Sequence, residues 1–269
     1  MPNPTYLPSY ANLMLAIGLI TMAPVALAQS DTVQLQSAAP GKDGGRVGLA
    51  AVAAPRYQGS DQRGGMLVPL LEYQWANGWF AGFGNGVGYN FSQRRDMQYG
   101  LRVTADFGRS ESRASALHGM GDIEPKPQWG AFANAFLSRD FALNASVRYG
   151  AGVDNDGAQM DVGASYSTAL APLWRLSMGL AATMANASYM RSYFGVTPAQ
   201  AAATRYTTYT PDGGLRDARA SLFITHQINP RTYLTAGVSA SALADTAKSS
   251  PLTREASTVT GLLAASYTF

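Results

Sequence analysis

The residues most able to do chemistry in this sequence are a histidine and the acids that follow it. His118 precedes Asp122 and Glu124 in a glycine-rich stretch, Leu-His-Gly-Met-Gly-Asp-Ile-Glu. A histidine close to carboxylates can act as a general base, and the carboxylates can hold a cation. Acids in such loops more commonly accept hydrogen bonds from backbone amides. We favour that structural role and predict no catalytic residue here.

A second acidic loop places Asp154 and Asp156 two residues apart. This spacing opens many calcium loops, but no glutamate follows at the distance that completes such a loop. The chain has no cysteine and two histidines, which excludes thiolate sites and argues against a multi-histidine metal site. It also lacks a nucleophile elbow and a phosphate-binding glycine motif at a helix start. The sequence therefore predicts no enzyme, no cofactor and no metal site.

Charge is scarce in this chain and nearly balanced. Charged residues make up 14% of the sequence and the net charge is +3, whereas an ordinary soluble domain carries about 25% charged residues. Binding to nucleic acid needs a clustered basic face. The near-neutral chain offers none, so we predict no nucleic-acid partner.

The first 28 residues are predicted to be a cleaved secretory signal peptide. They contain no charged side chain, and two apolar runs, 13–20 and 22–28, end in the sequence Ala-Leu-Ala, which suits signal peptidase. An uncleaved membrane anchor is the alternative, but the apolar run is short for about 20 spanning residues. Residues 29–45 are expected to be a flexible periplasmic lead-in.

From residue 46 onward, apolar and polar residues alternate. In 174–184, for example, the apolar face consists of Trp174, Leu176, Met178, Leu180, Ala182 and Met184. This period of two residues indicates strands, and a helical period of 3.6 residues does not fit. The segments run about ten residues, the length of a tilted strand that crosses a bilayer. Aromatic residues lie at the ends of the apolar faces, which is typical of the girdles of membrane barrels.

These features predict an all-β fold, a transmembrane antiparallel up-and-down β-barrel formed by residues 46–269. A soluble β-sandwich also alternates, but its strands have about five or six residues. Leu262 is an exception to the pattern, because it places a leucine on the polar face of the last segment. Closing the sheet pairs the backbone N–H and C=O groups of every strand with one another. Lipid offers these groups no hydrogen-bond partner.

About twelve strands are predicted, with both chain ends on the periplasmic side. The short links 76–77, 139–140, 171–173 and 229–231 are expected to be periplasmic turns. The longer, outward links are 58–65, 92–96, 120–128, 152–158, 185–214 and 244–255. The strands are 46–57, 66–75, 78–91, 97–107, 113–119, 129–138, 141–151, 159–169, 174–184, 215–228, 231–243 and 256–269. Ten strands is the alternative, because 113–119 is a weak strand and the glycine-rich 78–91 could bend.

The same alternation assigns eight charged side chains to the lumen. They are Glu72, Asp106, Asp161 and Asp217 as acids, and Arg102, Arg148, Arg175 and Arg219 as bases. Opposite charges in a confined space should pair, with arginine bonding carboxylates in a bidentate manner. We expect a packed polar network, since small barrels fill with side chains. A narrow selective pore or a gate is the alternative.

The longest link, 185–214, is rich in aromatic residues and arginine. Candidate outer-loop binding residues are Tyr189, Arg191, Tyr193, Phe194, Tyr206 and Tyr209. An exposed loop of this composition suits binding to a surface or partner, and a lid folded into the barrel mouth is an equal alternative. Residues 198–203 are expected to form a short helix, with proline near its start.

A series of short motifs runs along nearly the whole mature chain. They are 55–61 (Pro-Arg-Tyr-Gln-Gly-Ser-Asp), Pro69 with Tyr73, 78–80 (Gly-Trp-Phe), 99–102 (Tyr-Gly-Leu-Arg), 119–123 (Gly-Met-Gly-Asp-Ile), Tyr189 and Met190 with 193–196 (Tyr-Phe-Gly-Val), 250–252 (Ser-Pro-Leu) and 267–269 (Tyr-Thr-Phe). In order and spacing they resemble the MipA/OmpV family, the MltA-interacting outer-membrane proteins. The terminal Phe269 also resembles the signal that the barrel assembly machinery recognises.

The resemblance implies a barrel in the outer membrane of a Gram-negative bacterium, in contact with its lipid and without enzymatic activity. The named member of the family is similar to a scaffold that links a murein hydrolase (a lytic transglycosylase) to a peptidoglycan synthase. Other members resemble adhesins. We predict such a scaffold for this chain. A narrow channel for small solutes and an adhesin acting through outer loops are the alternatives.

Overall fold

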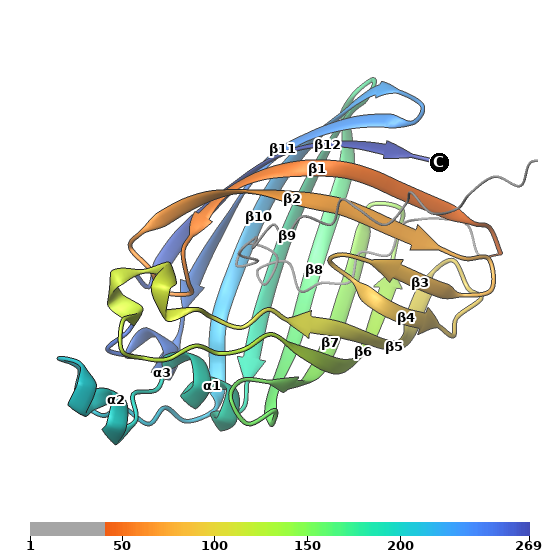
Figure 1. The fold of residues 1–269 in the computed structure, drawn as a ribbon. Coiled ribbons are helices and arrows are strands. Elements are labelled where there is room, and N and C mark those ends of the chain that lie inside the picture. Colours follow the sequence, from red (N-terminus) through yellow and green to blue (C-terminus); the bar gives the residue numbers. More distant parts are fainter. Residues whose placement is uncertain (1–40) are drawn as a thin grey trace, which may run out of the picture.

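Residues 41–269, the part of the chain that the computed structural model describes, form a closed antiparallel barrel of twelve strands (Figure 1). The strands are β1 (Gly44–Pro55), β2 (Arg63–Gln74), β3 (Trp79–Gly82), β4 (Gly86–Asn90), β5 (Met97–Asp106), β6 (Lys126–Phe136), β7 (Phe141–Ala151), β8 (Gly157–Ala171), β9 (Trp174–Ala185), β10 (Gly214–Asn229), β11 (Thr232–Leu243) and β12 (Ser257–Thr268). Each strand pairs with its neighbours in sequence, and β1 closes the barrel on β12. The predicted fold is confirmed. The predicted signal peptide (1–28) and most of the predicted lead-in (29–45) lie outside the described residues.

The outer face of the barrel is apolar, as the alternation predicts. Leu180 on β9 and Leu263 on β12 are 67% and 65% exposed, while Thr183 and Thr260 on the same two strands are buried. A surface that exposes leucine and buries threonine suits a surrounding of lipid rather than water. The sequence pattern therefore becomes a cylinder with a lipid-facing exterior and a polar interior.

Aromatic side chains collect where the short turns join the strands. Trp79 and Tyr89 meet edge to face with ring centroids 5.4 Å apart, and Trp174 stacks on His226 at 4.3 Å. Tryptophan and tyrosine side chains favour the interface between lipid and water, because the ring is apolar and its N–H or O–H group is polar. We call this end of the barrel the turn end.

Two of the predicted strands are wrong, although the count of twelve is right. Residues 78–91 do not form one strand, because the chain reverses after Gly82 and returns as β4. Gly86 has a φ of +74°, a conformation that glycine adopts without steric cost. Residues 113–119 contain two short 3-10 helices, Glu111–Arg113 and Ser115–Leu117, instead of a strand.

This hairpin also corrects the predicted direction of one link. Residues 92–96, predicted to face outward, join β4 to β5 and lie at the turn end with the other short turns. The extra reversal within 78–91 takes the place of the strand predicted at 113–119. Every later strand therefore keeps its predicted direction.

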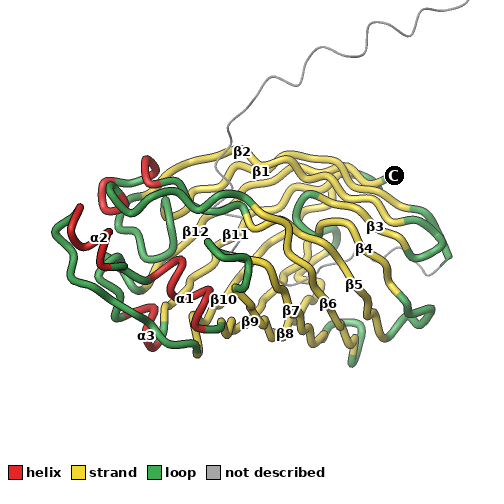
Figure 2. The backbone as a smooth tube through the Cα atoms, turned by 60° about the horizontal axis from the view of Figure 1, so that its bottom comes forward, coloured by secondary structure: helices red, strands yellow, loops and turns green. Residues whose placement is uncertain are grey.

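The long links pack together over the outer end of the barrel (Figure 2). We call residues 56–62, 107–125, 186–213 and 244–256 the cap. The cap includes α1 (Ala187–Phe194), α2 (Pro198–Ala203) and α3 (Asp245–Lys248). Three hydrogen bonds join separate links: the Tyr57 hydroxyl to the Leu252 carbonyl at 2.8 Å, the Tyr206 hydroxyl to the Ala116 carbonyl at 2.9 Å, and the Ser250 hydroxyl to the Phe194 carbonyl at 2.6 Å.

The predicted helix at 198–203 is confirmed as α2. Pro198 occupies its first turn, and Thr197 and Gln200 form a capping box at its start. Proline suits this position because its missing N–H would have no helical partner there. None of the helices within residues 41–269 is long and apolar enough to span a membrane.

Ionisation of Tyr57 is expected to loosen the cap only at high pH. Its side chain is 4% exposed and packs with Ala114, Ala116 and Leu117. Burial opposes the phenolate and raises the pKa of Tyr57 from 10.0 to about 12. Because the folded pKa is raised, this contribution to stability is complete below pH 10 and is lost as the pH rises towards 12.

The measurement is the phenolate absorbance of the wild type minus that of Tyr57→Phe, followed against pH. We expect a midpoint at about pH 12. A midpoint at the ordinary tyrosine value of about 10 would show that the cap leaves this side chain in water.

Candidate functional site

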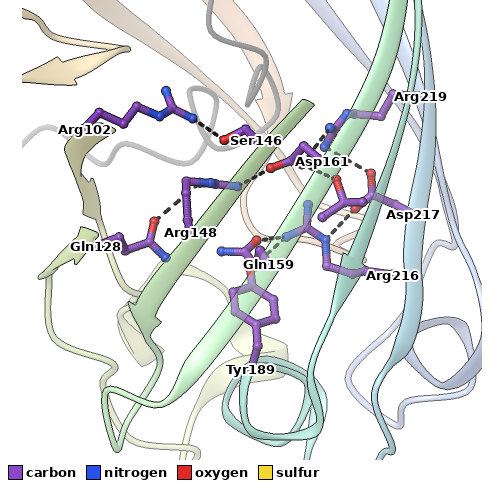
Figure 3. A network of polar contacts seen from close by, with 11 residues as sticks. Arg102, Gln128, Ser146, Arg148, Gln159, Asp161, Tyr189, Arg216, Asp217 and Arg219 are labelled. Carbon is purple, nitrogen blue, oxygen red and sulfur yellow. Dashed lines mark hydrogen bonds and ion pairs between the residues drawn. The ribbon is translucent and has the colours of Figure 1, made fainter. Parts of the chain in front are cut away.

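A connected network of charges lines the inner wall on β7, β8 and β10 (Figure 3). Its centre is Asp161, which is 1% exposed. The carboxylate pairs with Arg148 at 3.0 Å and with Arg219 at 3.4 Å, and it accepts a hydrogen bond from the Thr183 hydroxyl at 2.6 Å. Arg219 reaches on to Asp217 at 3.1 Å. Since water is scarce around these groups, each charge depends on its partners in the network.

Arg216 belongs to the network, although strict alternation assigns it to the lipid face. The pairing of β10 with β9 shifts register between Leu215 and Asp217. This β-bulge turns two successive side chains inward. Arg216 is 1% exposed and donates to Asp217, Gln159 and the Tyr189 hydroxyl. The sequence holds one signal of this bulge: strict alternation places an arginine on the lipid face, where a charge is costly.

The network extends along the wall towards β5 and β6. Arg148 also donates to the Gln128 side-chain oxygen at 3.4 Å. Arg102 on β5 donates to the Ser146 hydroxyl at 2.7 Å. The buried charges of this wall are four arginines and two aspartates: Arg102, Arg148, Arg216, Arg219, Asp161 and Asp217. The wall therefore has a cationic excess that suits an anionic group.

Three of the eight predicted lumen charges lie apart from this network. Glu72 pairs with Arg46 at 3.8 Å. Asp106 accepts hydrogen bonds from the Tyr193 hydroxyl at 2.6 Å and from the backbone N–H of Gly152 at 3.1 Å, so it anchors the cap. Arg175 donates to the carbonyl of Ser167 on the neighbouring strand. The other five lie in the network or beside it.

The candidate outer-loop residues lie mostly inside the cap. Tyr189 and Phe194 are 4% and 1% exposed, and Tyr189 contacts Arg216 from the cap side of the lumen (Figure 3). Burial raises the pKa of Tyr193, which bonds Asp106. Tyr206 and Tyr209 donate their hydroxyls to the carbonyls of Ala116 and Thr246. Arg191 is exposed and bonds Ser188. These contacts place α1 as a lid over the barrel mouth.

The wall opposite the network is apolar, which alternation alone does not predict. Ala50, Val52, Ala54 and Val68 form a buried cluster on β1 and β2, and Leu262 on β12 packs against it. β7 and β8 are six and five strands away from β1 in the twelve-strand order, so their part of the network faces this aliphatic wall. The lumen is therefore amphipathic: cationic on one side and aliphatic on the other.

The acids near His118 serve the backbone of the cap. Asp122 accepts a hydrogen bond from the N–H of Glu111, and Glu111 accepts from the N–H groups of Gly119 and Gly121. His118 itself is exposed. No group of three or more histidine, aspartate or glutamate residues suited to a metal ion occurs within 41–269. Asp122 therefore accepts a hydrogen bond from a backbone amide, which is the role that the sequence favoured for it.

Several solved outer-membrane proteins are similar to this chain at low identity. An outer membrane channel from Pseudomonas putida F1 has 12% identity and a TM-score of 0.45, covering 84% of this chain and 94% of its own. The NanC porin has 10% identity and a TM-score of 0.44, covering 81% and 98%. The Pseudomonas putida toluene transporter TodX has 11% identity and a TM-score of 0.40, covering 91% and 93%.

Among curated proteins, none matches this chain. The profile of one family, described as the MltA-interacting protein MipA, matches residues 47–269. The match covers nearly the whole of the described barrel, and it agrees with the resemblance found in the motifs. The chain is therefore an outer-membrane β-barrel that belongs to the family of the MltA-interacting protein MipA.

Proposed function

We propose that this barrel is a non-enzymatic scaffold that binds a murein hydrolase of the MltA type at its turn end and holds it near a peptidoglycan synthase. The family match supports this proposal. The observation that carries it is a basic excess at the turn end, where a periplasmic partner would dock. The exposed charges there are Lys42, Arg94, Arg95, Arg139 and Arg231 against Asp43, Asp96 and Asp140.

The basic excess at the turn end remains when the ion pair between Arg94 and Asp96 is set aside, because that pair removes one charge of each sign. Arg94 donates two hydrogen bonds to Asp96, at 2.8 and 2.5 Å, and this contact lowers the pKa of the Asp96 carboxyl. Asp43 accepts a hydrogen bond from the backbone N–H of Ala76. Two of the three acids are thus engaged within the barrel. The remaining arginines favour a partner with an acidic surface, since charge complementarity steers association and fixes orientation.

The test is a triple charge reversal at the turn end, Arg94→Glu with Arg95→Glu and Arg139→Glu. We expect its affinity for the MltA-type transglycosylase of the same organism to fall about tenfold or more, with a weaker dependence on salt. Binding is measured by interferometry on the barrel in detergent micelles. The matched control is Arg63→Glu with Arg191→Glu and Arg205→Glu, three exposed arginines at the opposite end. Equal affinity of the reversed and control variants would contradict the proposal.

A second candidate function is the passage of small solutes. The cationic wall of the lumen favours it, because buried arginines outnumber buried aspartates there. Planar-bilayer recordings would show a conductance that changes on Arg102→Gln. A silent bilayer would remove this candidate and leave the scaffold.

A further inference from the structure

Two strands stop short of the outer half of the barrel wall (Figure 1). β3 has four residues and β4 has five, whereas the other strands have ten to sixteen. β3 pairs with β2 only at 72–74, and β4 pairs with β5 only at 100–103. In the described barrel, no strand fills the wall between the outer parts of β2 and β5.

The backbone of β2 has the character of a free edge in this region. The N–H of Phe83 donates to the carbonyl of Leu71, which is the last rung between the hairpin and β2. Backbone groups of alternate residues point to the same side of a strand, so those of Pro69, Leu67 and Gly65 face the unfilled wall. Proline is confined to strand edges because it has no N–H to donate. Pro69 therefore suits a strand that lacks a neighbour here.

The cap bounds the unfilled wall on its outer side. Arg56 donates to the carbonyl of Arg113 at 3.1 Å, and Gln62 donates to the Ser115 hydroxyl at 3.0 Å. Both contacts join the link after β1 to the link after β5. The opening is thus enclosed by β2, the β3–β4 hairpin, β5 and the cap. We call it the window.

The lumen behind the window offers a polar niche beside an apolar surface. A cavity of about 50 Å³ lies between the hairpin tip and the network and is lined in part by Phe83, Thr104, Asp106, Phe107, Arg102 and Arg148. The Asp106 carboxylate is occupied by Tyr193 and by backbone N–H groups. The rings of Phe83 and Phe107 lie 5.9 Å apart. On the other side of the window, Met66, Val68 and Leu70 belong to the aliphatic wall.

We propose that the window is a lateral passage through which small amphiphiles, with an apolar body and one anionic head, move between the lumen and the membrane. An unpaired strand edge is tolerated at membrane depth only where protein covers it or a wet cavity lies beside it. A passage supplies that cavity. The Arg102 and Arg148 guanidiniums suit a sulfonate or carboxylate head, while the aliphatic wall and the two phenylalanines suit the body.

Two glycines at the window allow it to be filled without disturbing the fold. A Cβ added to Gly65 on β2 or to Gly84 at the hairpin tip meets no atom within 4 Å. The variant Gly65→Trp with Gly84→Trp should therefore obstruct the window. Gly261 on β12 is also free of neighbours within 4 Å and lies two strands from Gly65, on the side of β1 that is turned away from the window. Gly261→Trp is the matched control.

The probe is 8-anilinonaphthalene-1-sulfonate, an aromatic anion whose fluorescence rises in lipid. Added to vesicles, it enters the outer leaflet quickly and the inner leaflet slowly. We expect the wild-type barrel to accelerate the slow phase, the double tryptophan variant to return it to the rate of protein-free vesicles, and Gly261→Trp to keep the wild-type rate. Heat-modifiable migration on gels verifies that each variant is folded.

A second variant tests the selection of the head group. Arg102→Gln should raise the probe concentration needed for half-maximal rate about tenfold, because a charge-assisted contact is lost. A wild-type rate in the obstructed variant, or no acceleration by the wild-type barrel, would overturn the passage. The hydrolase docks at the turn end and is measured separately, so loss of either proposal leaves the other standing.

Discussion

Replacing Asp161 with alanine is expected to lower the free energy of unfolding by about 3–5 kcal/mol, because it removes the carboxylate that two buried arginines share. The carboxylate pairs with Arg148 and Arg219 and accepts from Thr183. All four side chains are buried, so water cannot replace the lost contacts. Two guanidiniums would then face each other across an empty site.

The measurement is urea unfolding of the barrel in lipid vesicles, followed by tryptophan fluorescence. Asp140→Ala is the control, since Asp140 is an exposed turn residue, and we expect it to change stability by about 0.5 kcal/mol or less. The double variant Asp161→Ala with Arg148→Met should lose less than the sum of the single losses, because removing both partners leaves fewer uncompensated charges. Equal stability of Asp161→Ala and the control would refute the network as a structural element.

Substituting alanine at Gly86 is expected to detach the β3–β4 hairpin from β5. The residue has a φ of +74°, and an added Cβ would overlap the carbonyl oxygen of Val103, a backbone atom that cannot move aside cheaply. The strained conformation alone costs about 1–3 kcal/mol, and loss of the rung between Val87 and Val103 adds to it. The window would then widen on the side that the β3–β4 hairpin bounds.

The matched control is Gly84→Ala in the same turn, where an added Cβ meets no atom within 4 Å. Hydrogen exchange of the amides in β3, β4 and β5 separates the two variants. We expect fast exchange in Gly86→Ala and wild-type protection in Gly84→Ala. Comparable protection in both would mean that the hairpin tolerates a side chain at this position.

The two walls of the lumen give the barrel an interior unlike a uniform aqueous pore. The network supplies cationic groups on β5, β7 and β10, and the wall of β1, β2 and β12 supplies aliphatic ones. The cap covers the outer end with packed side chains from four links. A lateral route and a docking surface at the turn end can therefore coexist on one molecule.

The sequence was sufficient for the barrel and for much of its interior. Alternation is a local property, because successive side chains of a strand point to opposite faces. It assigned Arg148, Asp161, Asp217 and Arg219 to the lumen, where they form one network. Turn residues and strand lengths likewise place the short turns at one end.

Alternation fails wherever a strand contains a bulge or reverses early. Strict alternation places Arg216 on the lipid face, because the bulge beside Asp217 depends on pairing with β9, a separate segment of the chain. The pattern of 78–91 predicts one strand where the structure has a hairpin, because its glycines permit both a bend and a reversal. In each case a regular strand and the observed conformation differ in their contacts with neighbouring strands. A local sequence pattern carries no information on those contacts.

The sequence by itself determined the membrane barrel, its family and the polar face of most strands, because these follow from the period of two residues and from short motifs. Only the tertiary structure decided where α1 packs, which wall of the lumen is apolar, and where the wall lacks strands. Those features arise when segments distant in the sequence meet, as Leu262 meets Val52 and Ala264 meets Ala50. Closure of the sheet brings these pairs together.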